Sequence, residues 1–174
     1  MKEIVLKYGI AGGIVIAAPM FIIIPNIDSI GFDKGENILF TTMIISFLAI
    51  YLGIGANRKK LGGGNIGFRS AFVTGLLITV LISSFYVAAS MFLFYKIAPD
   101  FTDKYNAFML QQMKAQHISQ QQITEYATNI EQGKTQNPFI TAAMTFMKPV
   151  TFGLFFTVSS SLILRKKPFT PQAN

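Results

Sequence analysis

Four apolar segments, each long enough to cross a lipid bilayer as a helix, dominate the sequence. They cover residues 4–24, 38–56, 71–97 and 139–164. The second contains 19 residues without a charge, which as a helix would rise about 28 Å, close to the roughly 30 Å hydrocarbon core of a bilayer. None carries the polar stripe, repeated every three or four residues, of a helix on the surface of a soluble protein. The sequence therefore predicts an all-α polytopic membrane protein with four transmembrane helices.

Composition favours this interpretation over two alternatives. Of the 174 residues, 51% are hydrophobic and 13% are charged, which is unusual for a soluble domain. A buried bundle in a soluble protein typically has apolar runs of roughly 10 to 14 residues, shorter than these. A cleavable signal peptide is the alternative for residues 4–24, but this segment exceeds the usual apolar core and no convincing small-x-small site follows it. We therefore expect it to be retained, and residues 1–174 to form one membrane domain.

The distribution of basic residues predicts the orientation of the chain. With Lys7 counted before the first span, and Lys96 and Lys148 counted between the third and the fourth, the segments before, between and after the four spans carry net charges of +1, −2, +4, +1 and +3 in chain order. Short loops rich in Lys and Arg stay in the cytoplasm. We therefore expect both termini and loop 57–70 to be cytoplasmic, and loop 98–138 to be extracytoplasmic. The residues expected to face lipid headgroups and to set this orientation are Arg58, Lys59, Lys60, Arg69, Arg165, Lys166 and Lys167.

Loop 57–70 also contains Gly62, Gly64 and Gly67, at the G-x-G-x-x-G spacing of a dinucleotide-binding turn. That turn requires a strand before the glycines and an acidic residue about 20 positions later. Here a membrane-length segment precedes them, and the third apolar segment contains no Asp or Glu. The basic residues of the loop could contact nucleic acid, but lipid phosphates are already adjacent. We expect no cofactor and no nucleic-acid partner, and we expect Ser70 to cap the third helix.

Residues 98–138, the only sizeable polar stretch, are predicted to form a helical hairpin. Pro99 should end the third span. The first hairpin helix is indicated by an apolar stripe, and the second by a capping box followed by its own stripe. We expect a C-cap at the end of the second helix and an N-cap before the fourth span. The stripe of the first helix is Phe101, Tyr105, Phe108 and Met109. The capping box of the second helix is Ser119 with Gln122, and its stripe is Ile123, Tyr126, Ala127 and Ile130. The C-cap is Gly133, and Asn137 and Pro138 are the N-cap and first residue of the fourth span.

The apolar stripe of the first hairpin helix has three possible partners. It can pack on the second hairpin helix, lie on the membrane surface, or bind another protein. Packing within the hairpin or on the membrane is the simpler hypothesis, because amphipathic helices beside spans commonly settle at the interface. A cap over a ligand site is the more specific hypothesis.

Lys148 is the only candidate for an ionisable group deep inside a span. Counted back from Leu164 at about 1.5 Å per residue, it lies roughly 24 Å from the cytoplasmic end, near the opposite headgroups, where a lysine can snorkel. An ion pathway is the alternative. The hydroxyls of the spans usually bond to backbone carbonyls or neighbouring helices. With His117 alone in the hairpin and no cysteine in the chain, we expect neither a catalytic set nor a metal site.

Small residues recur at every fourth position and predict close packing of the spans. Such ridges let the backbones of two membrane helices approach each other. Most should be used within the four-helix bundle, so that only a leftover ridge could mediate oligomerisation. Pro19 is expected to kink the first span. The ridges are Gly9, Gly13 and Ala17; Ala49 and Gly53; Ala71 and Gly75; and Gly153, Thr157 and Ser161.

Five stretches of the sequence, taken in order, resemble a known family. They are YLGIGANRK at the end of the second span, GGGNIGFRSAFVTG at the start of the third, KIAPDFTDKY after it, QNP before the fourth, and LILRKK at its end. In order and spacing they are similar to a family of small bacterial membrane proteins with four spans, defined only as a domain of unknown function. The resemblance covers nearly the whole chain and implies an inner-membrane protein with a helical extracytoplasmic loop. It implies no activity and no catalytic residue.

These observations favour a protein that acts through its packing surfaces. We expect a non-enzymatic scaffold or accessory subunit that contacts membrane lipids and binds a membrane-protein partner or further copies of itself. The alternative is a small oligomeric transporter or channel, in which Lys148 and the hydroxyls of the spans line a path. An intramembrane enzyme is disfavoured, because no acid, base and nucleophile occur together.

Overall fold

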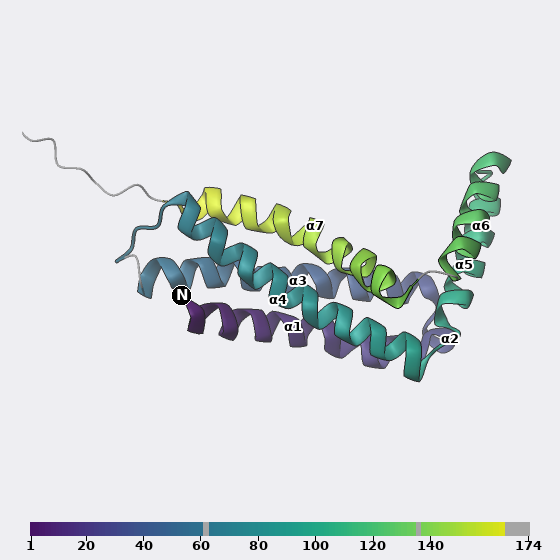
Figure 1. Ribbon diagram of the computed structural model, residues 1–174, viewed down its shortest axis with the longest axis horizontal. Coiled ribbons are helices and arrows are strands. Elements are labelled where there is room, and N and C mark those ends of the chain that lie inside the picture. Colours follow the sequence, from purple (N-terminus) through teal and green to yellow (C-terminus); the bar gives the residue numbers. More distant parts are fainter. Residues whose placement is uncertain (61–62, 135–136, 166–174) are drawn as a thin grey trace, which may run out of the picture.

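The computed structural model is built from helices, and it describes residues 1–60, 63–134 and 137–165. Four long helices lie side by side, and a pair of shorter helices stands across one end of them (Figure 1). The long helices are α1 (Lys2–Ile23), α3 (Phe32–Lys60), α4 (Phe68–Phe92) and α7 (Pro138–Leu164). The shorter elements are α2 (Ile27–Ile30), the π-helical turn η1 (Leu93–Ile97), α5 (Phe101–Ala115) and α6 (Gln120–Lys134).

All four long helices are long and apolar enough to cross a membrane, so the prediction that these four segments form helices of membrane length is confirmed. All four begin before the apolar segments of the sequence do, and α3 also ends later. α3 covers residues 32–60 instead of 38–56, because flanking Lys, Glu and Arg residues continue a helix readily. The π-helical turn that follows α4 ends at Ile97, two residues before Pro99, in agreement with the expected helix end.

Two of the predicted helix caps are wrong. Ser70 does not cap α4, because the helix already begins at Phe68 with Gly67 as its N-cap. Gly67 has an extended backbone, which any residue adopts, and the chain enters the helix there without a side-chain cap. Gly133 is not a C-cap, because α6 continues through it to Lys134.

Two other caps are confirmed. The Ser119 hydroxyl accepts a hydrogen bond from the Gln122 amide at 3.4 Å, and it donates to Gln122 Oε1 at 3.0 Å. Asn137 Oδ1 accepts a hydrogen bond from the Phe139 amide at 2.9 Å. The bonds from the Gln122 and Phe139 amides satisfy donors that the first turn of a helix leaves without an intrahelical partner.

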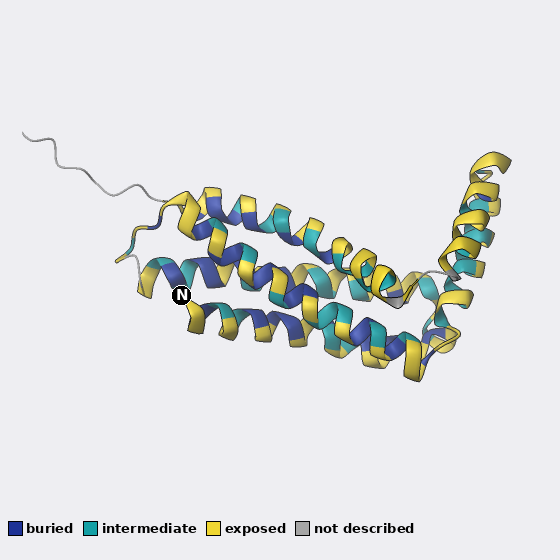
Figure 2. Ribbon diagram, in the orientation of Figure 1, coloured by how far each residue is buried: buried dark blue, intermediate teal, exposed yellow. Residues whose placement is uncertain are grey.

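Helices α3 and α4 form the centre of the bundle, and α1 and α7 lie on opposite sides of this pair (Figure 1). The space between the helices is filled by apolar side chains, of which Phe47, Ile50, Ile54, Ile78 and Ile82 are completely buried. Exposed residues lie along the outside of all four helices (Figure 2), and many of them are large and apolar. Such an apolar exterior is unusual for a soluble protein and suits a lipid environment.

Glycines bring α1 close to α4. A Cβ atom added to Gly9 would lie 2.5 Å from Cδ2 of Leu81, and one added to Gly13 would lie 2.5 Å from Cγ of Phe85. A side chain at either position therefore requires its neighbour to move. Between membrane helices there is no hydrophobic driving force, so such close contact supplies much of the association energy.

Glycines also set the contact between α4 and α7. Gly75 faces Thr157, whose Cγ2 would lie 2.8 Å from an added Cβ, and Gly153 faces Thr79. The two contacts are one turn apart on each helix, as expected for antiparallel helices in register. Residues from two of the predicted ridges therefore face each other. Gly53 of a third ridge faces Ile78 on α4.

Helices α5 and α6 pack against each other as a hairpin that lies across the bundle instead of along its axis (Figure 1). The turn between them includes His117, whose φ of 54° lies in the left-handed region. We call this end of the bundle the hairpin end. The opposite end, where α1 and α4 begin and α3 and α7 finish, is called the basic end.

Candidate functional site

Helix α5 is docked onto the start of α3 by a cluster of aromatic rings. The ring centroid of Phe32 lies 5.9 Å from that of Phe101, 6.0 Å from that of Tyr105 and 4.9 Å from that of Phe108. Phe101 also stacks on Phe94 of η1 at 5.3 Å. The predicted stripe of α5 thus packs on the segment between the first two spans, which differs from the three partners that the sequence suggested. A lone phenylalanine there has no periodic signal by which it could be identified.

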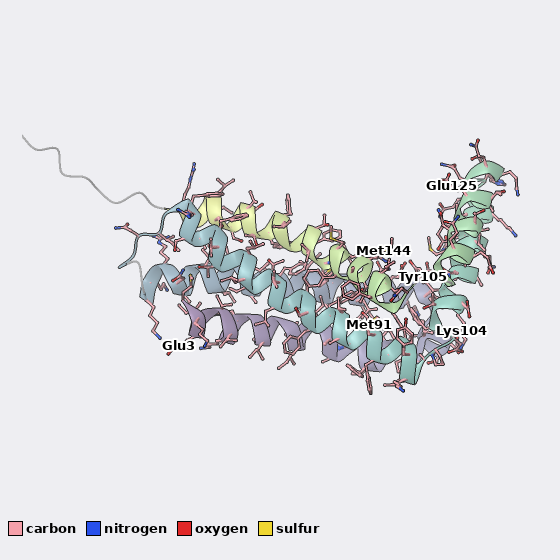
Figure 3. The ribbon with its side chains drawn as sticks, in the orientation of Figure 1. Glu3, Met91, Lys104, Tyr105, Glu125 and Met144 are labelled. Atoms are coloured by element: carbon pink, nitrogen blue, oxygen red, sulfur yellow. The ribbon has the colours of Figure 1, made fainter. Side chains whose placement is uncertain are left out.

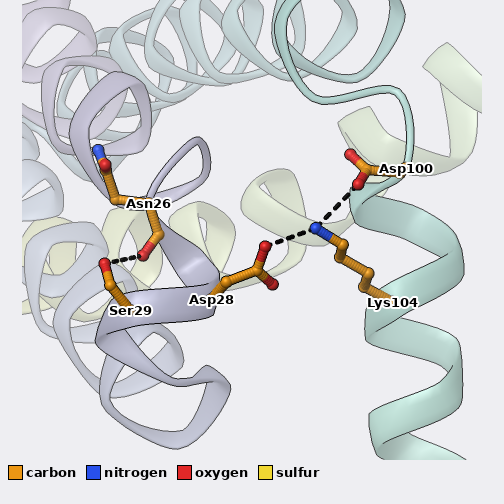
Figure 4. A network of polar contacts seen from close by, with 5 residues as sticks. All are labelled: Asn26, Asp28, Ser29, Asp100 and Lys104. Atoms are coloured by element: carbon orange, nitrogen blue, oxygen red, sulfur yellow. Dashed lines mark hydrogen bonds and ion pairs between the residues drawn. The ribbon is translucent and has the colours of Figure 1, made fainter.

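An ion-pair network orients the same helix. Lys104 Nζ lies 2.6 Å from Asp28 Oδ2 and 2.8 Å from Asp100 Oδ2, so one ammonium group joins two carboxylates (Figure 4). Asp28 belongs to α2, and Asp100 immediately precedes α5. These groups are exposed, and exposed ion pairs contribute little to stability. The aromatic cluster therefore supplies most of the docking energy, and the ion pairs set the direction of α5.

Two further hydrogen bonds join α5 to the segment between the first two spans. The Tyr105 hydroxyl donates to Glu36 Oε1 at 2.7 Å, and Gln112 Nε2 donates to Asp33 Oδ1 at 3.1 Å. With Asp28, this means that each of the three carboxylates between the first two spans accepts a hydrogen bond from α5. From the sequence these carboxylates counted only as negative loop charge, because nothing local shows which helix will meet them.

These contacts shift the pKa values of Asp100, Lys104 and Tyr105. The hydrogen bond to Lys104 lowers the pKa of Asp100, and the hydrogen bonds to Asp100 and Asp28 raise the pKa of Lys104. Burial among the rings, and next the hydrogen bond to the Glu36 carboxylate, raise the pKa of Tyr105. The phenol therefore stays protonated, and stays a donor, well above neutral pH.

We expect the docking of α5 to weaken as the pH rises above about 9. Tyr105 and Lys104 reach Glu36 and Asp28 across the contact, and the pKa of each is raised. A phenol or ammonium group with a raised pKa stabilises the docked state below its free pKa of about 10, and this contribution is lost as the pH rises. Distances between spin labels attached at Gln121 on α6 and Ile22 on α1 should broaden above about pH 9. An unchanged distance distribution from about pH 7 to pH 11 would contradict the prediction.

Helix α6 packs on α5 by one face and leaves the other exposed. The Tyr126 hydroxyl donates to Asn106 Oδ1 at 3.3 Å, and Ile123 is buried. Glu125 lies on the part of the hairpin farther from the bundle than Lys104 (Figure 3). A shallow depression runs along the exposed face, but a single helix lines it, so it encloses no ligand. Its residues are polar: Gln120, Gln121, Thr124, Glu125, Thr128 and Asn129.

Arg58 closes loop 57–70, which contains the predicted glycines and is called the glycine loop below, by two hydrogen bonds. Its Nε donates to the Gly64 carbonyl at 2.7 Å, and the Gly64 amide donates to the Arg58 carbonyl at 3.1 Å. Gly63 and Gly64 have φ of 54° and 91°, a region in which glycine is favoured. These glycines therefore serve a turn, whereas a dinucleotide site would need the strand and the acid that the sequence lacks.

The other predicted headgroup residues that the structure describes lie at the basic end. Lys60 Nζ pairs with Glu3 Oε2 at 2.8 Å, which ties the end of α3 to the start of α1. In Figure 3, Glu3 lies at the opposite end of the molecule from Lys104 and Tyr105. Lys59, Arg69 and Arg165 are exposed, and Gly62, Lys166 and Lys167 lie outside the described residues.

Lys148 is exposed on α7 and has no ion-pair partner among the described residues. It lies three residues from the midpoint of α7 (Pro138–Leu164). The helix continues through Pro149, which is fully buried.

Polar side chains of the long helices bond inside the bundle. Asn57 Nδ2 donates to Thr74 Oγ1 at 2.6 Å, and both groups are buried. The sequence placed Asn57 in a loop, although it falls one turn after Gly53 on the same helical face. Thr79 and Thr157 share a hydrogen bond at 3.0 Å across the α4–α7 contact. In the described part of the chain, no group of three or more His, Asp or Glu side chains could hold a metal ion.

A family model matches residues 7–166, from the first long helix to the end of the last. The matched region thus includes the bundle and the hairpin, and it confirms the resemblance to a domain of unknown function. Comparisons with curated proteins and with solved structures find no match. The chain therefore belongs to the family described as "Protein of unknown function (DUF4199)".

Proposed function

We propose that this chain is a multi-pass protein of the bacterial inner membrane that acts as a non-enzymatic scaffold or accessory subunit. The bundle anchors the α5–α6 hairpin at the extracytoplasmic surface, where the exposed face of α6 receives a partner protein. One observation carries this proposal. α5 is fixed to the bundle by the Phe32 cluster and three carboxylates, whereas the polar face of α6 is left exposed.

The proposed orientation places both termini and the basic end in the cytoplasm. The support for it is the dense basic charge at that end, where Arg58, Lys59, Lys60 and Arg69 lie within a dozen residues. At the hairpin end, lysines are interspersed with acidic groups, and Lys104 is neutralised by Asp28 and Asp100.

A small oligomeric transporter or channel is the second candidate. It is favoured by the buried hydroxyls of Ser83 and Ser161, which have no hydrogen-bond partner within the described residues. Against it, completely buried side chains such as Phe47 and Ile78 fill the interior of a single copy. Lys148 lies on the outside of the bundle and could line a path only between copies.

Cysteine accessibility tests the orientation, and the chain has no native cysteine to interfere. A cysteine replacing Gln121 on α6 should react with a membrane-impermeant maleimide in cells whose outer membrane has been permeabilised. A cysteine replacing Asn65 in the glycine loop should react only after the inner membrane is opened. The reverse pattern would contradict the proposed orientation.

Site-specific crosslinking tests the scaffold role. A photo-crosslinking residue at Gln121 should give one discrete protein adduct in cells, because α6 is proposed to meet a specific partner. The same residue at Ala11, which is exposed on α1, serves as the control for random contacts in the membrane. If both positions give only lipid adducts, or the same set of proteins, the scaffold proposal fails.

A further inference from the structure

We infer that Lys148 docks a transmembrane helix of another protein, one that carries an Asp or Glu near its middle. The inference rests on the proposed function and names the chemistry of the partner. Its basis is the depth of Lys148, its exposure, and the distribution of acidic residues along the chain.

The depth of Lys148 follows from the register of α7 against α4. Gly75 faces Thr157, and Gly153 faces Thr79. One further turn on each helix places Pro149 at the level of Ser83, near the middle of the apolar helix 68–97. Lys148 thus lies near mid-span on α7 and on α4 alike. Its side chain is exposed, so it points away from the bundle.

A cation at this depth requires a partner. From Lys148 to the start of α7 at Pro138 the helix rises about 15 Å. A helix of 27 residues centred on a core of roughly 30 Å extends about 5 Å beyond it at each end, which leaves Lys148 about 10 Å inside the boundary, farther than a lysine side chain extends. An isolated charge at this depth costs several kcal/mol. An opposite charge on a neighbouring helix removes most of that cost, which is why ionisable residues in spans commonly occur in pairs.

The partner cannot be a second copy of this chain. Residues 4–27, 37–99 and 132–174 contain no Asp or Glu, and these ranges include the apolar part of every span. The acidic residues lie near the start of α1, around the hairpin end and in the hairpin. Within the membrane the chain offers a base and no acid, so a complementary carboxylate has to come from a different protein.

The surface around Lys148 suits a helix. Met144 and Phe155, one turn before it and two turns after it, are 57% and 70% exposed. Thr151 lies between them on the same face, and its hydroxyl is already bonded to the Met147 carbonyl. Methionine adapts its shape to a partner surface, and an apolar strip around a single charge provides both contact area and register.

The test uses the full chain in phosphatidylcholine bilayers and synthetic transmembrane peptides as probes. The peptides are Leu-Ala helices with Glu, Gln or Leu at the central position. Energy transfer between a dye on the chain and a dye on the peptide measures association. We expect the Glu peptide to bind roughly tenfold more tightly than the Gln and Leu peptides, as polar contacts between membrane helices allow. Lys148→Leu should remove this preference, whereas Lys7→Leu, which removes a charge near the basic end, should keep it.

Equal binding of the Glu and Leu peptides would overturn the inference, as would a preference that survives Lys148→Leu. It would also be overturned if Lys148 instead bound phosphatidylglycerol in preference to phosphatidylcholine. That result would place the ammonium group of Lys148 at the headgroups. Cysteine labelling of the same preparation shows independently whether the chain spans the bilayer. A failure of the inference is therefore distinguishable from a failure of the proposed function.

Discussion

Replacing Gly13 with leucine should separate α1 from α4 and lower the free energy of unfolding by about 3 kcal/mol or more. An added Cβ would lie 2.5, 2.6 and 2.9 Å from Cγ, Cδ2 and Cβ of Phe85. Because these atoms include the base of the side chain, rotation of the ring cannot clear the space. The backbone of α1 or α4 has to move, and the neighbouring contacts of both helices weaken with it.

Ala11→Leu is the matched control for Gly13→Leu. Ala11 lies two residues away on the same helix, and its side chain is exposed. Both variants introduce the same leucine, so a general effect on membrane insertion would appear in both. Thermal unfolding in detergent, followed by circular dichroism and by elution as a single species, measures the difference. Similar midpoints for the two variants would show that α1 does not pack as described.

Replacing Phe32 with alanine should release the hairpin from the bundle. The ring of Phe32 contacts three rings of α5, and aromatic pairs contribute roughly 0.5–1.5 kcal/mol each, so we expect a loss of about 2–3 kcal/mol of docking energy. The exposed ion pairs of Lys104 are too weak to hold α5 alone. The spin-label distance between Gln121 and Ile22 should change from a narrow to a broad distribution.

Phe139→Ala is the control for Phe32→Ala. Phe139 also lies at the hairpin end, but its side chain is 80% exposed, so its loss should leave the distance distribution narrow. Unfolding of the four long helices should be little affected in either variant, because the core around Phe47 and Ile78 is far from these positions. A narrow distribution in Phe32→Ala would show that polar contacts are sufficient for docking.

The features predicted correctly from the sequence depend on residues close together in the chain. The four apolar helices follow from uninterrupted runs, and the caps at Ser119 and Asn137 follow from residues two or three positions apart. The cap predicted at Ser70 failed for a local reason as well. A helix can start at an uncapped glycine, and the apolar run does not mark its first turn.

Contacts between distant segments were not predictable. The small-residue ridges indicated which faces could pack closely, but not that Gly13 meets Phe85 or that Gly153 meets Thr79. The partner of the α5 stripe lies about 70 residues earlier in the chain, at Phe32. No periodicity within one segment contains information about such a pairing.

The sequence by itself determined that the chain forms four membrane-length helices and a polar hairpin, since length, apolarity and helical period are properties of single segments. The tertiary structure decided how those segments meet. It placed Phe32 against α5, turned the carboxylates Asp28, Asp33 and Glu36 toward α5, and left Lys148 exposed. The physical reason is that burial and ion pairing depend on which helix faces reach one another, and that is fixed by the packing of the whole bundle.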